Sequence, residues 1–200
     1  MTIPRRFNGP PDFGHGGYSC GSVAALVEAP AASVSLRRPV PLDTPLEVRR
    51  GDDATVALFH RDEVVAEGVP AQLELDVPEP VPVEAARAAR GGNPWLQRHP
   101  FPTCFGCGSE RDRAEAIATL LGPVDGREDL MADTWTPQAE FADAEGAVAP
   151  LFVWAALDCP TGAAAVISPE GEVCGVSVGL WIELRDPATH GARTEAERRA

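Results

Sequence analysis

Two stretches of the chain are apolar on every side of a helical turn, a pattern typical of helices that other structure surrounds. The first, Gly14–Glu28, is rich in small residues. The second, Val148–Ala165, has Pro150 where a first helical turn tolerates a missing N–H. Further along, Pro160 and Gly162 are expected to end or kink this helix. The pattern therefore predicts two buried helices.

Between these helices the pattern changes to short runs separated by turn residues, which predicts strands. Gly51-Asp52-Asp53 and Arg61-Asp62 supply tight turns, and the run from Leu73 to Val77 alternates with period two. The four predicted strands are Ala32–Val40, Pro45–Arg50, Ala54–His60 and Glu63–Val77. One helix followed by an antiparallel meander is an α+β unit whose sheet curls around the helix. This first unit spans residues 8–78.

A linker is predicted over residues 79–99, where a proline-rich connector leads into a short helix at Glu84–Arg90. The pattern then starts again in a second unit, residues 100–185. Its expected elements are strands at Ala116–Leu121 and Asp129–Trp135, the second helix, and a strand at Val173–Leu184. One clear strand after the helix leaves this unit incomplete, and residues 186–200 are expected to be a frayed tail. Because open sheet edges are usually covered by association, we expect a homodimer or higher homo-oligomer.

Charge narrows the classes of partner. The formal net charge is −13, and all seventeen basic residues are arginine. Such a chain repels nucleic acid and anionic membrane surfaces, so neither is expected as a partner. Arginines 37, 38, 49 and 50 could form a local anion site, although paired arginines at strand ends are usually solvated. No stretch approaches the ~20 apolar residues of a membrane span, and no apolar region follows the first arginines, so a cytoplasmic protein is expected.

Asp158 is the most informative single residue, because it follows the apolar run from Val153 to Leu157. An ionised carboxylate buried in such surroundings needs partners, or it favours its protonated form. Carboxylates in that state serve as general bases or nucleophiles. The alternative is a structural aspartate satisfied by an arginine or by backbone N–H groups.

The five cysteines are odd in number and irregularly spaced, so they do not indicate a disulfide framework. Cys104 and Cys107 form a CxxC motif, with His99 five residues before it. Zinc typically needs a second pair of ligands, and a redox CxxC normally opens a helix, whereas this one lies in a loop rich in proline and glycine. The expectation is therefore structural cysteines, with no metal and no cofactor.

Three segments together resemble actinobacterial thioesterase-like proteins with a double hotdog fold. They are Phe7–Cys20, His99–Gly108 and Phe152–Pro160, and the resemblance covers most of residues 7–182. It implies two units, each with a long helix in a curved antiparallel sheet, paired back to back. It also implies that the ligand is an acyl-CoA or acyl-carrier thioester, with coenzyme A only as part of the substrate.

In hotdog thioesterases of this type, an Asn and a His-Gly-Gly stand at the start of one helix, and a carboxylate on the partner helix performs the attack. Asn8, His15, Gly16 and Gly17 match the first part of that pattern. Glycines permit close approach of the backbone, and a helix N-terminus stabilises a developing oxyanion.

The carboxylate of that pattern would fall on the first helix at Ala24, so this helix has no acid of its own. The second helix lacks the glycine pair but has Asp158. If the two units pair as in a hotdog dimer, Asn8, Gly16 and Gly17 face Asp158 and one complete site forms. The resemblance therefore implies a thioester hydrolase with Asp158 as its carboxylate.

Two other functions are alternatives to the thioester hydrolase. A non-catalytic acyl-CoA-binding or degenerate hotdog protein fits the short second unit, because strands that would shape an acyl pocket are missing from the pattern. A hotdog dehydratase is disfavoured, because Asp12 and His15 are the nearest approach to the Asp and His that hydration chemistry needs at a helix start.

Overall fold

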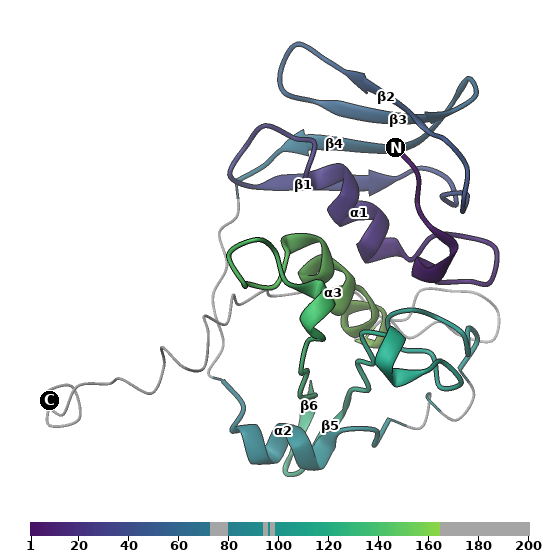
Figure 1. Ribbon diagram of the computed structural model, residues 1–200. Coiled ribbons are helices and arrows are strands. Elements are labelled where there is room, and N and C mark those ends of the chain that lie inside the picture. The colour runs from purple at the N-terminus through teal and green to yellow at the C-terminus, as the bar shows by residue number, and fades with distance from the viewer. Residues whose placement is uncertain (73–79, 94–95, 97–98, 165–200) are drawn as a thin grey trace, which may run out of the picture.

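The computed structural model describes residues 1–72, 80–93, 96 and 99–164 (Figure 1). It is a mixed α+β structure built around a four-stranded antiparallel sheet. The strands are β1 (Ala32–Leu36), β2 (Glu47–Arg50), β3 (Val56–His60) and β4 (Glu63–Pro70), in the spatial order β1-β4-β3-β2. Each lies inside a predicted strand, and the predicted antiparallel pairing is confirmed. The meander holds for β2, β3 and β4 only, because β1 pairs with β4 at the edge of the sheet and not with β2, its neighbour in sequence.

The two faces of this sheet differ because neighbouring side chains on a strand point to opposite sides. Val34, Leu58 and Ala66 belong to the hydrophobic core, which contains Val23 of the first helix. Ser33 and Ser35 alternate with Val34 and are exposed on the other face. The sheet therefore has one face on the core and one face toward solvent.

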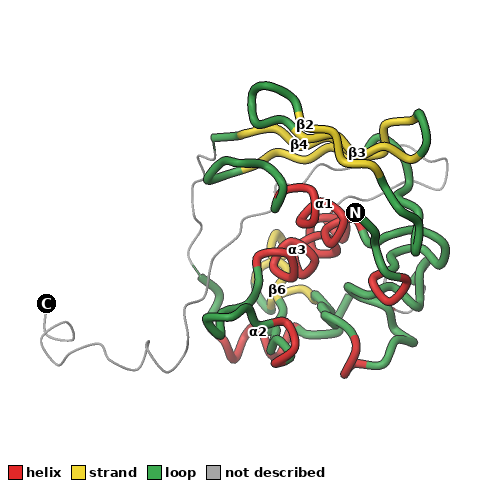
Figure 2. Tube along the Cα trace, turned by 45° about the horizontal axis from the view of Figure 1, so that its top comes forward, coloured by secondary structure: helices red, strands yellow, loops and turns green. Residues whose placement is uncertain are grey.

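Helix α1 (Gly16–Ala24) lies between the sheet and helix α3 (Pro150–Ala164), as Figures 1 and 2 show. The predicted first helix is confirmed, although it is shorter than Gly14–Glu28. A Cβ atom on Gly68 of β4 would come within 2.9 Å of methyl groups of Val23 and Val27. Glycine at this position therefore allows the helix to pack closely on the sheet.

Helix α3 differs from its prediction in two ways. It continues through Pro160 to Ala164, so the proline does not end it. It is also not buried on every side: Phe152, Ala155 and Ala156 are buried, whereas Leu157 is half-buried. An apolar sequence all round the helix overestimates burial here, because α1 and the Phe141 ring cover only part of the surface of α3 over residues 150–160.

The second half of the described chain contains a two-stranded hairpin, β5 (Gly122–Val124) and β6 (Arg127–Ala132). Helix α2 (Val83–Ala89), inside the segment predicted as a linker, packs against this hairpin. Three short 3₁₀ helices complete the described elements: Arg5–Phe7, Arg113–Glu115 and Ala139–Phe141.

The predicted strand at Ala116–Leu121 is wrong. The N–H groups of Ile117 and Thr119 donate to the carbonyls of Phe105 and Gly106, and Ala118 has a positive φ of 58°. These residues bond to a loop instead of a strand, and the positive φ breaks any extended run. The predicted strand at Val173–Leu184 and the tail at residues 186–200 lie outside the described residues.

Aromatic side chains from distant segments join the two halves. Phe7 stacks on Tyr18 with ring centroids 3.9 Å apart, and Phe141 stacks on Phe152 at 4.2 Å. Phe105 contacts Phe7 edge-on at 4.9 Å. Such rings bury ~150–250 Å² each, so this cluster is a main source of hydrophobic stabilisation. It lies next to the start of α1 and the first turn of α3.

No helix in the described part of the chain is both long and apolar enough to cross a membrane.

Candidate functional site

The N-terminus of α1 meets Asp158 of α3. The backbone N–H of Gly17 donates to Oδ2 of Asp158 at 2.9 Å. A Cβ atom on Gly16 would lie 2.8 Å from the same oxygen, so Gly16 also faces the carboxylate. The prediction that Gly16 and Gly17 of the first unit face Asp158 is confirmed.

His15 caps α1 and is almost fully buried, at 1 % exposure. Its Nδ1 accepts a hydrogen bond from the backbone N–H of Tyr18 at 3.2 Å, so a neutral ring has its proton on Nε2. That Nε2 is 3.5 Å from Oδ2 of Asp158 and 3.4 Å from Sγ of Cys159. His15 therefore connects the helix start to two successive residues of α3.

The pKa of His15 reflects opposing effects. Burial of the ring lowers the pKa, because it disfavours the charged imidazolium. A hydrogen bond with Cys104 and the negative charge of Asp158 act in the other direction and outweigh burial, so the pKa of His15 is raised. The site therefore favours positive charge on this ring more than burial alone would allow.

Two glycines of α1 allow the two helices to touch. A Cβ atom on Gly17 would lie 2.2 Å from the carbonyl oxygen of Trp154, and one on Gly21 would lie 2.8 Å from Cβ of Trp154. Because no real Cβ atom tolerates such contacts, side chains at these positions would force the helices apart. Gly17, which matches the thioesterase pattern, thus also has a packing role that the motif alone did not reveal.

Asp158 is more accessible than expected. Its side chain is 40 % exposed, so the predicted burial is wrong. The residue lies on the side of α3 that faces the start of α1. The glycines at that start have no side chains that could cover it. An anion near a helix N-terminus is favourable, since the first N–H groups of the helix lack internal partners. This contact also fits the structural alternative, in which backbone N–H groups satisfy the aspartate.

Asn8 was expected to face Asp158 together with the glycines, but its side chain bonds to a neighbouring loop. Its amide nitrogen donates to the carbonyls of Gly9 at 3.1 Å and Thr103 at 3.2 Å, and its Oδ1 accepts from Arg111 at 2.6 Å. The backbone carbonyl of Asn8 accepts from Phe105 N–H at 2.8 Å. Asn8 therefore anchors the loop that contains Cys104 and Cys107. Arg111 was missed from the sequence, where no motif marks it.

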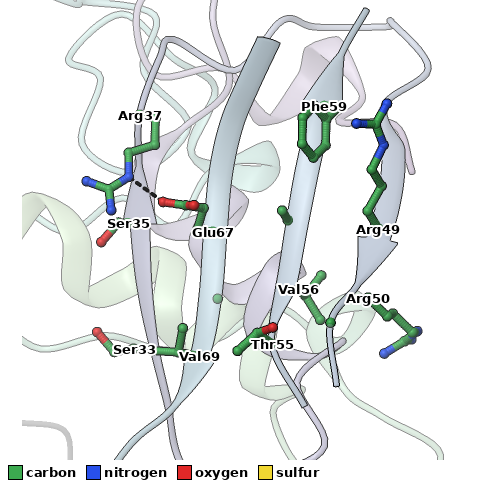
Figure 3. A pocket seen from close by; sticks show the side chains of 13 residues that line it. Ser33, Ser35, Arg37, Arg49, Arg50, Thr55, Val56, Phe59, Glu67 and Val69 are labelled. Atoms are coloured by element: carbon green, nitrogen blue, oxygen red, sulfur yellow. Dashed lines mark hydrogen bonds and ion pairs between the residues drawn. The ribbon is translucent and has the colours of Figure 1, made fainter. Parts of the chain in front are cut away.

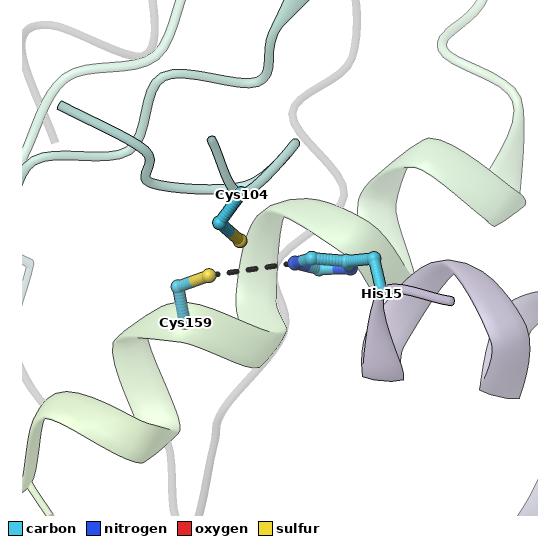
Figure 4. A group of neighbouring side chains, drawn as sticks. All are labelled: His15, Cys104 and Cys159. Atoms are coloured by element: carbon cyan, nitrogen blue, oxygen red, sulfur yellow. Dashed lines mark hydrogen bonds between the residues drawn. The ribbon is translucent and has the colours of Figure 1, made fainter. Parts of the chain in front are cut away.

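His15, Cys104 and Cys159 form a cluster at the Nε2 atom of the His15 ring. Their possible ligand atoms, Nε2 and two Sγ atoms, all lie within 4.8 Å of one another (Figure 4). The sequence suggested Cys104 and Cys107 as a half site, and the fold adds Cys159, which follows Asp158 directly. In the described part of the chain, these three residues bring possible metal ligands close together.

Three of the four arginines suggested as an anion site, Arg37, Arg49 and Arg50, line a groove on the solvent face of the sheet (Figure 3). Arg37 pairs with Glu67 at 2.5 Å, and Arg49 pairs with Glu47 at 2.8 Å. Arg38 and Arg50 likewise lie within 4 Å of glutamate carboxylates. These carboxylates compete with any bound anion, and the groove lies on the opposite face of the sheet from α1. The arginines therefore do not belong to the Asp158 site.

Comparison of the chain with protein-family models, with curated proteins and with solved structures finds no match in any of the three.

Proposed function

We propose that the protein is a thioester hydrolase that acts on an acyl-CoA or acyl-carrier thioester, with Asp158 as its catalytic carboxylate. The observation that carries this proposal is the contact at 2.9 Å between the Gly17 N–H and the Asp158 carboxylate. In this proposal the Gly17 N–H is the oxyanion-stabilising group and Asp158 is the base, and the two lie one hydrogen bond apart on two different helices. The double hotdog arrangement that the sequence resembles belongs to the same proposal.

The reaction needs two groups that lie together here. The thioester carbonyl oxygen accepts the Gly17 N–H in place of the carboxylate, and the positive end of α1 stabilises the charge that develops on it. Asp158 takes a proton from a water molecule, and the water oxygen adds to the carbonyl carbon. The carbon–sulfur bond of the tetrahedral intermediate then breaks, and the proton passes to the departing thiolate. The products are a carboxylic acid and a free thiol.

The surroundings of Asp158 support this role. Its 40 % exposed side chain leaves room for water and substrate, which a fully buried aspartate would not. His15 Nε2, 3.5 Å from Oδ2, holds the carboxylate in place from the buried side. His15 is thus proposed as a positioning residue, and Gly16 as the residue whose missing side chain leaves space for the carboxylate.

One competing function uses the same contact. In a non-catalytic acyl-CoA-binding protein, Asp158 only caps α1, and the Gly17 N–H stays bonded to the carboxylate. The two functions differ in turnover, because a cap binds a thioester without cleaving it.

The deciding experiment measures thiol release from a panel of acyl-CoA thioesters that spans short, long and aromatic acyl groups. For the best substrate, Asp158→Asn is compared with Asp125→Asn, a matched loss of one charge at an exposed residue in the β5–β6 turn. Asp158→Asn should stay folded and lose at least ~10²-fold in kcat, because the amide keeps the shape but cannot take a proton. Asp125→Asn should keep wild-type turnover.

One of three outcomes counts against the hydrolase, and the other two count against Asp158 as its catalytic carboxylate. Full activity in Asp158→Asn makes the carboxylate structural. Saturable binding of acyl-CoA by the wild type without turnover selects the binding protein. An unfolded Asp158→Asn variant, judged by circular dichroism, shows that the cap is the main role of Asp158.

A further inference from the structure

Three cysteine thiols from two separate segments converge behind His15. Cys104 and Cys107 lie on the loop that Asn8 anchors, and Cys159 is on α3. The Sγ atoms of Cys104 and Cys107 are 3.8 Å apart, and Sγ of Cys159 lies within 4.8 Å of Sγ of Cys104. Figure 4 shows Cys104 and Cys159 pointing toward each other and toward His15. Such convergence of three thiols needs an explanation beyond packing.

The distance between the sulfurs of Cys104 and Cys107 matches that of two thiolates bound to one tetrahedral metal ion. Zinc–sulfur bonds of ~2.3 Å at tetrahedral angles place two thiolates about 3.8 Å apart, the separation of Cys104 and Cys107. Their CxxC spacing is also one at which zinc sites take two ligands from one loop. A disulfide would need a sulfur–sulfur distance of about 2.0 Å and would use only two of the three thiols.

Both histidines at the cluster act as hydrogen-bond donors to sulfur. His15 Nδ1 accepts from the Tyr18 N–H, and His99 Nδ1 accepts from the Phe101 N–H at 2.9 Å. Each neutral ring therefore has its proton on Nε2. His99 Nε2 is 3.1 Å from Sγ of Cys107, and His15 Nε2 is 3.4 Å from Sγ of Cys159. Because a protonated Nε2 cannot bind a metal, the ligands at this site are the sulfurs.

The backbone of the loop passes close to the cluster. Gly106 lets the loop backbone cover the cluster, since a Cβ atom there would lie 2.4 Å from His15 Nε2 and 2.5 Å from Cys159 Sγ.

We propose that Cys104, Cys107 and Cys159 bind one zinc ion as thiolates, with His15 and His99 donating hydrogen bonds to the sulfurs and a ligand from solution in the fourth position. The ion would tie the loop to α3 at the residue next to Asp158. Each protonated thiol releases its proton when the metal binds. The sequence led us to expect structural cysteines without a metal, because the third ligand is a lone cysteine far along the chain. This proposal does not depend on the proposed hydrolase.

The test measures zinc by inductively coupled plasma mass spectrometry in the full chain, reconstituted with zinc chloride under reducing conditions and then dialysed. The wild type should retain ~1 zinc per chain, and Cys104→Ser, Cys107→Ser and Cys159→Ser should each retain less than ~0.2. Cys20→Ser is the matched control, because Cys20 is a partly buried thiol on α1 outside the cluster, and it should retain wild-type zinc. His15→Gln should also retain zinc.

The proposal fails if the reconstituted wild type holds less than ~0.2 zinc per chain, or if Cys20→Ser loses as much zinc as the three cluster variants. Loss of zinc in a folded His15→Gln overturns the three-thiolate ligand set. Cobalt(II) substitution of the wild type gives a readout that needs no variant to fold. Thiolate-to-cobalt charge-transfer bands should appear with one equivalent of cobalt, and their absence would refute thiolate ligation.

Discussion

Alanine at Gly17 should separate the two helices, and alanine at Gly16 should not. The Cβ atom of Gly17→Ala would lie 2.2 Å from the Trp154 carbonyl oxygen, 2.7 Å from Cβ of Asp158 and 2.9 Å from the Trp154 carbonyl carbon. Backbone atoms cannot turn aside as a flexible side chain can. The Gly16→Ala Cβ atom meets only the end of the Asp158 side chain, with its nearest atom at 2.8 Å.

The expected size of the effect follows from these contacts. An ordinary contact is above 3 Å, so α1 and α3 must part by about 1 Å in Gly17→Ala. Overpacking of this kind costs about 1–3 kcal/mol, and backbone on both sides puts this case near the upper end. Alanine has a higher helix propensity than glycine, and this offsets at most about 1 kcal/mol of the cost. The net loss in the free energy of unfolding should be about 2 kcal/mol, which lowers Tm by roughly 4–8 °C for a chain of this size.

Urea denaturation followed by circular dichroism measures both variants against the wild type. Gly16→Ala should stay within about 1 kcal/mol, because the carboxylate can rotate away. If Gly17→Ala unfolds within about 0.5 kcal/mol of the wild type, or if Gly16→Ala loses as much stability, the close α1–α3 contact is not what this glycine provides. Gly17 would then belong to the proposed site without contributing to the packing of α1 on α3.

Three more predictions can be checked on the same protein. Burial, with a smaller effect of the Asp158 charge, raises the pKa of Cys20 from 9.0 to about 12. Its alkylation by iodoacetamide at pH 8, mapped by mass spectrometry, should therefore be about 1,000-fold slower than in urea, because the thiolate fraction falls by that factor, and equal rates would contradict the burial of this thiol. Asp133 accepts hydrogen bonds from Arg90 and from the Leu120 N–H, both at 2.5 Å, and its side chain is 6 % exposed. Asp133→Ala should therefore lower the free energy of unfolding, measured by urea denaturation, by about 3 kcal/mol. A loss below about 1 kcal/mol would show that this network is dispensable. Light scattering should find a homodimer or larger assembly, and a monomer at micromolar concentration would disprove the expected association.

Local pattern predicted most of the first half of the molecule. The four strands and α1 were recovered because each has its own signal, either alternation bounded by turn residues or an apolar run with helix spacing. The prediction of a strand at Ala116–Leu121 was wrong, because the apolar residues of this segment pack into the core from a loop. There, Ile117 and Thr119 bond to Phe105 and Gly106, partners that no local pattern specifies.

The candidate site was predicted in part. The sequence resemblance placed Gly16 and Gly17 against Asp158, and the structure has that contact. Asn8 matched the same motif but binds Thr103 and Arg111 instead. A motif records which residue types occur together, whereas the direction of an amide side chain depends on partners brought in by the fold.

By itself, the sequence determined the four strands of the sheet, the positions of the two main helices and the acidic character of the chain, because these depend on neighbouring residues and on composition. Only the tertiary structure decided that Asp158 is 40 % exposed and that Cys159 lies beside Cys104 and His15. The physical reason is the same in both cases. Exposure and convergence depend on how closely α3 packs on α1 and on the loop, and that distance is set by contacts between residues far apart in the chain.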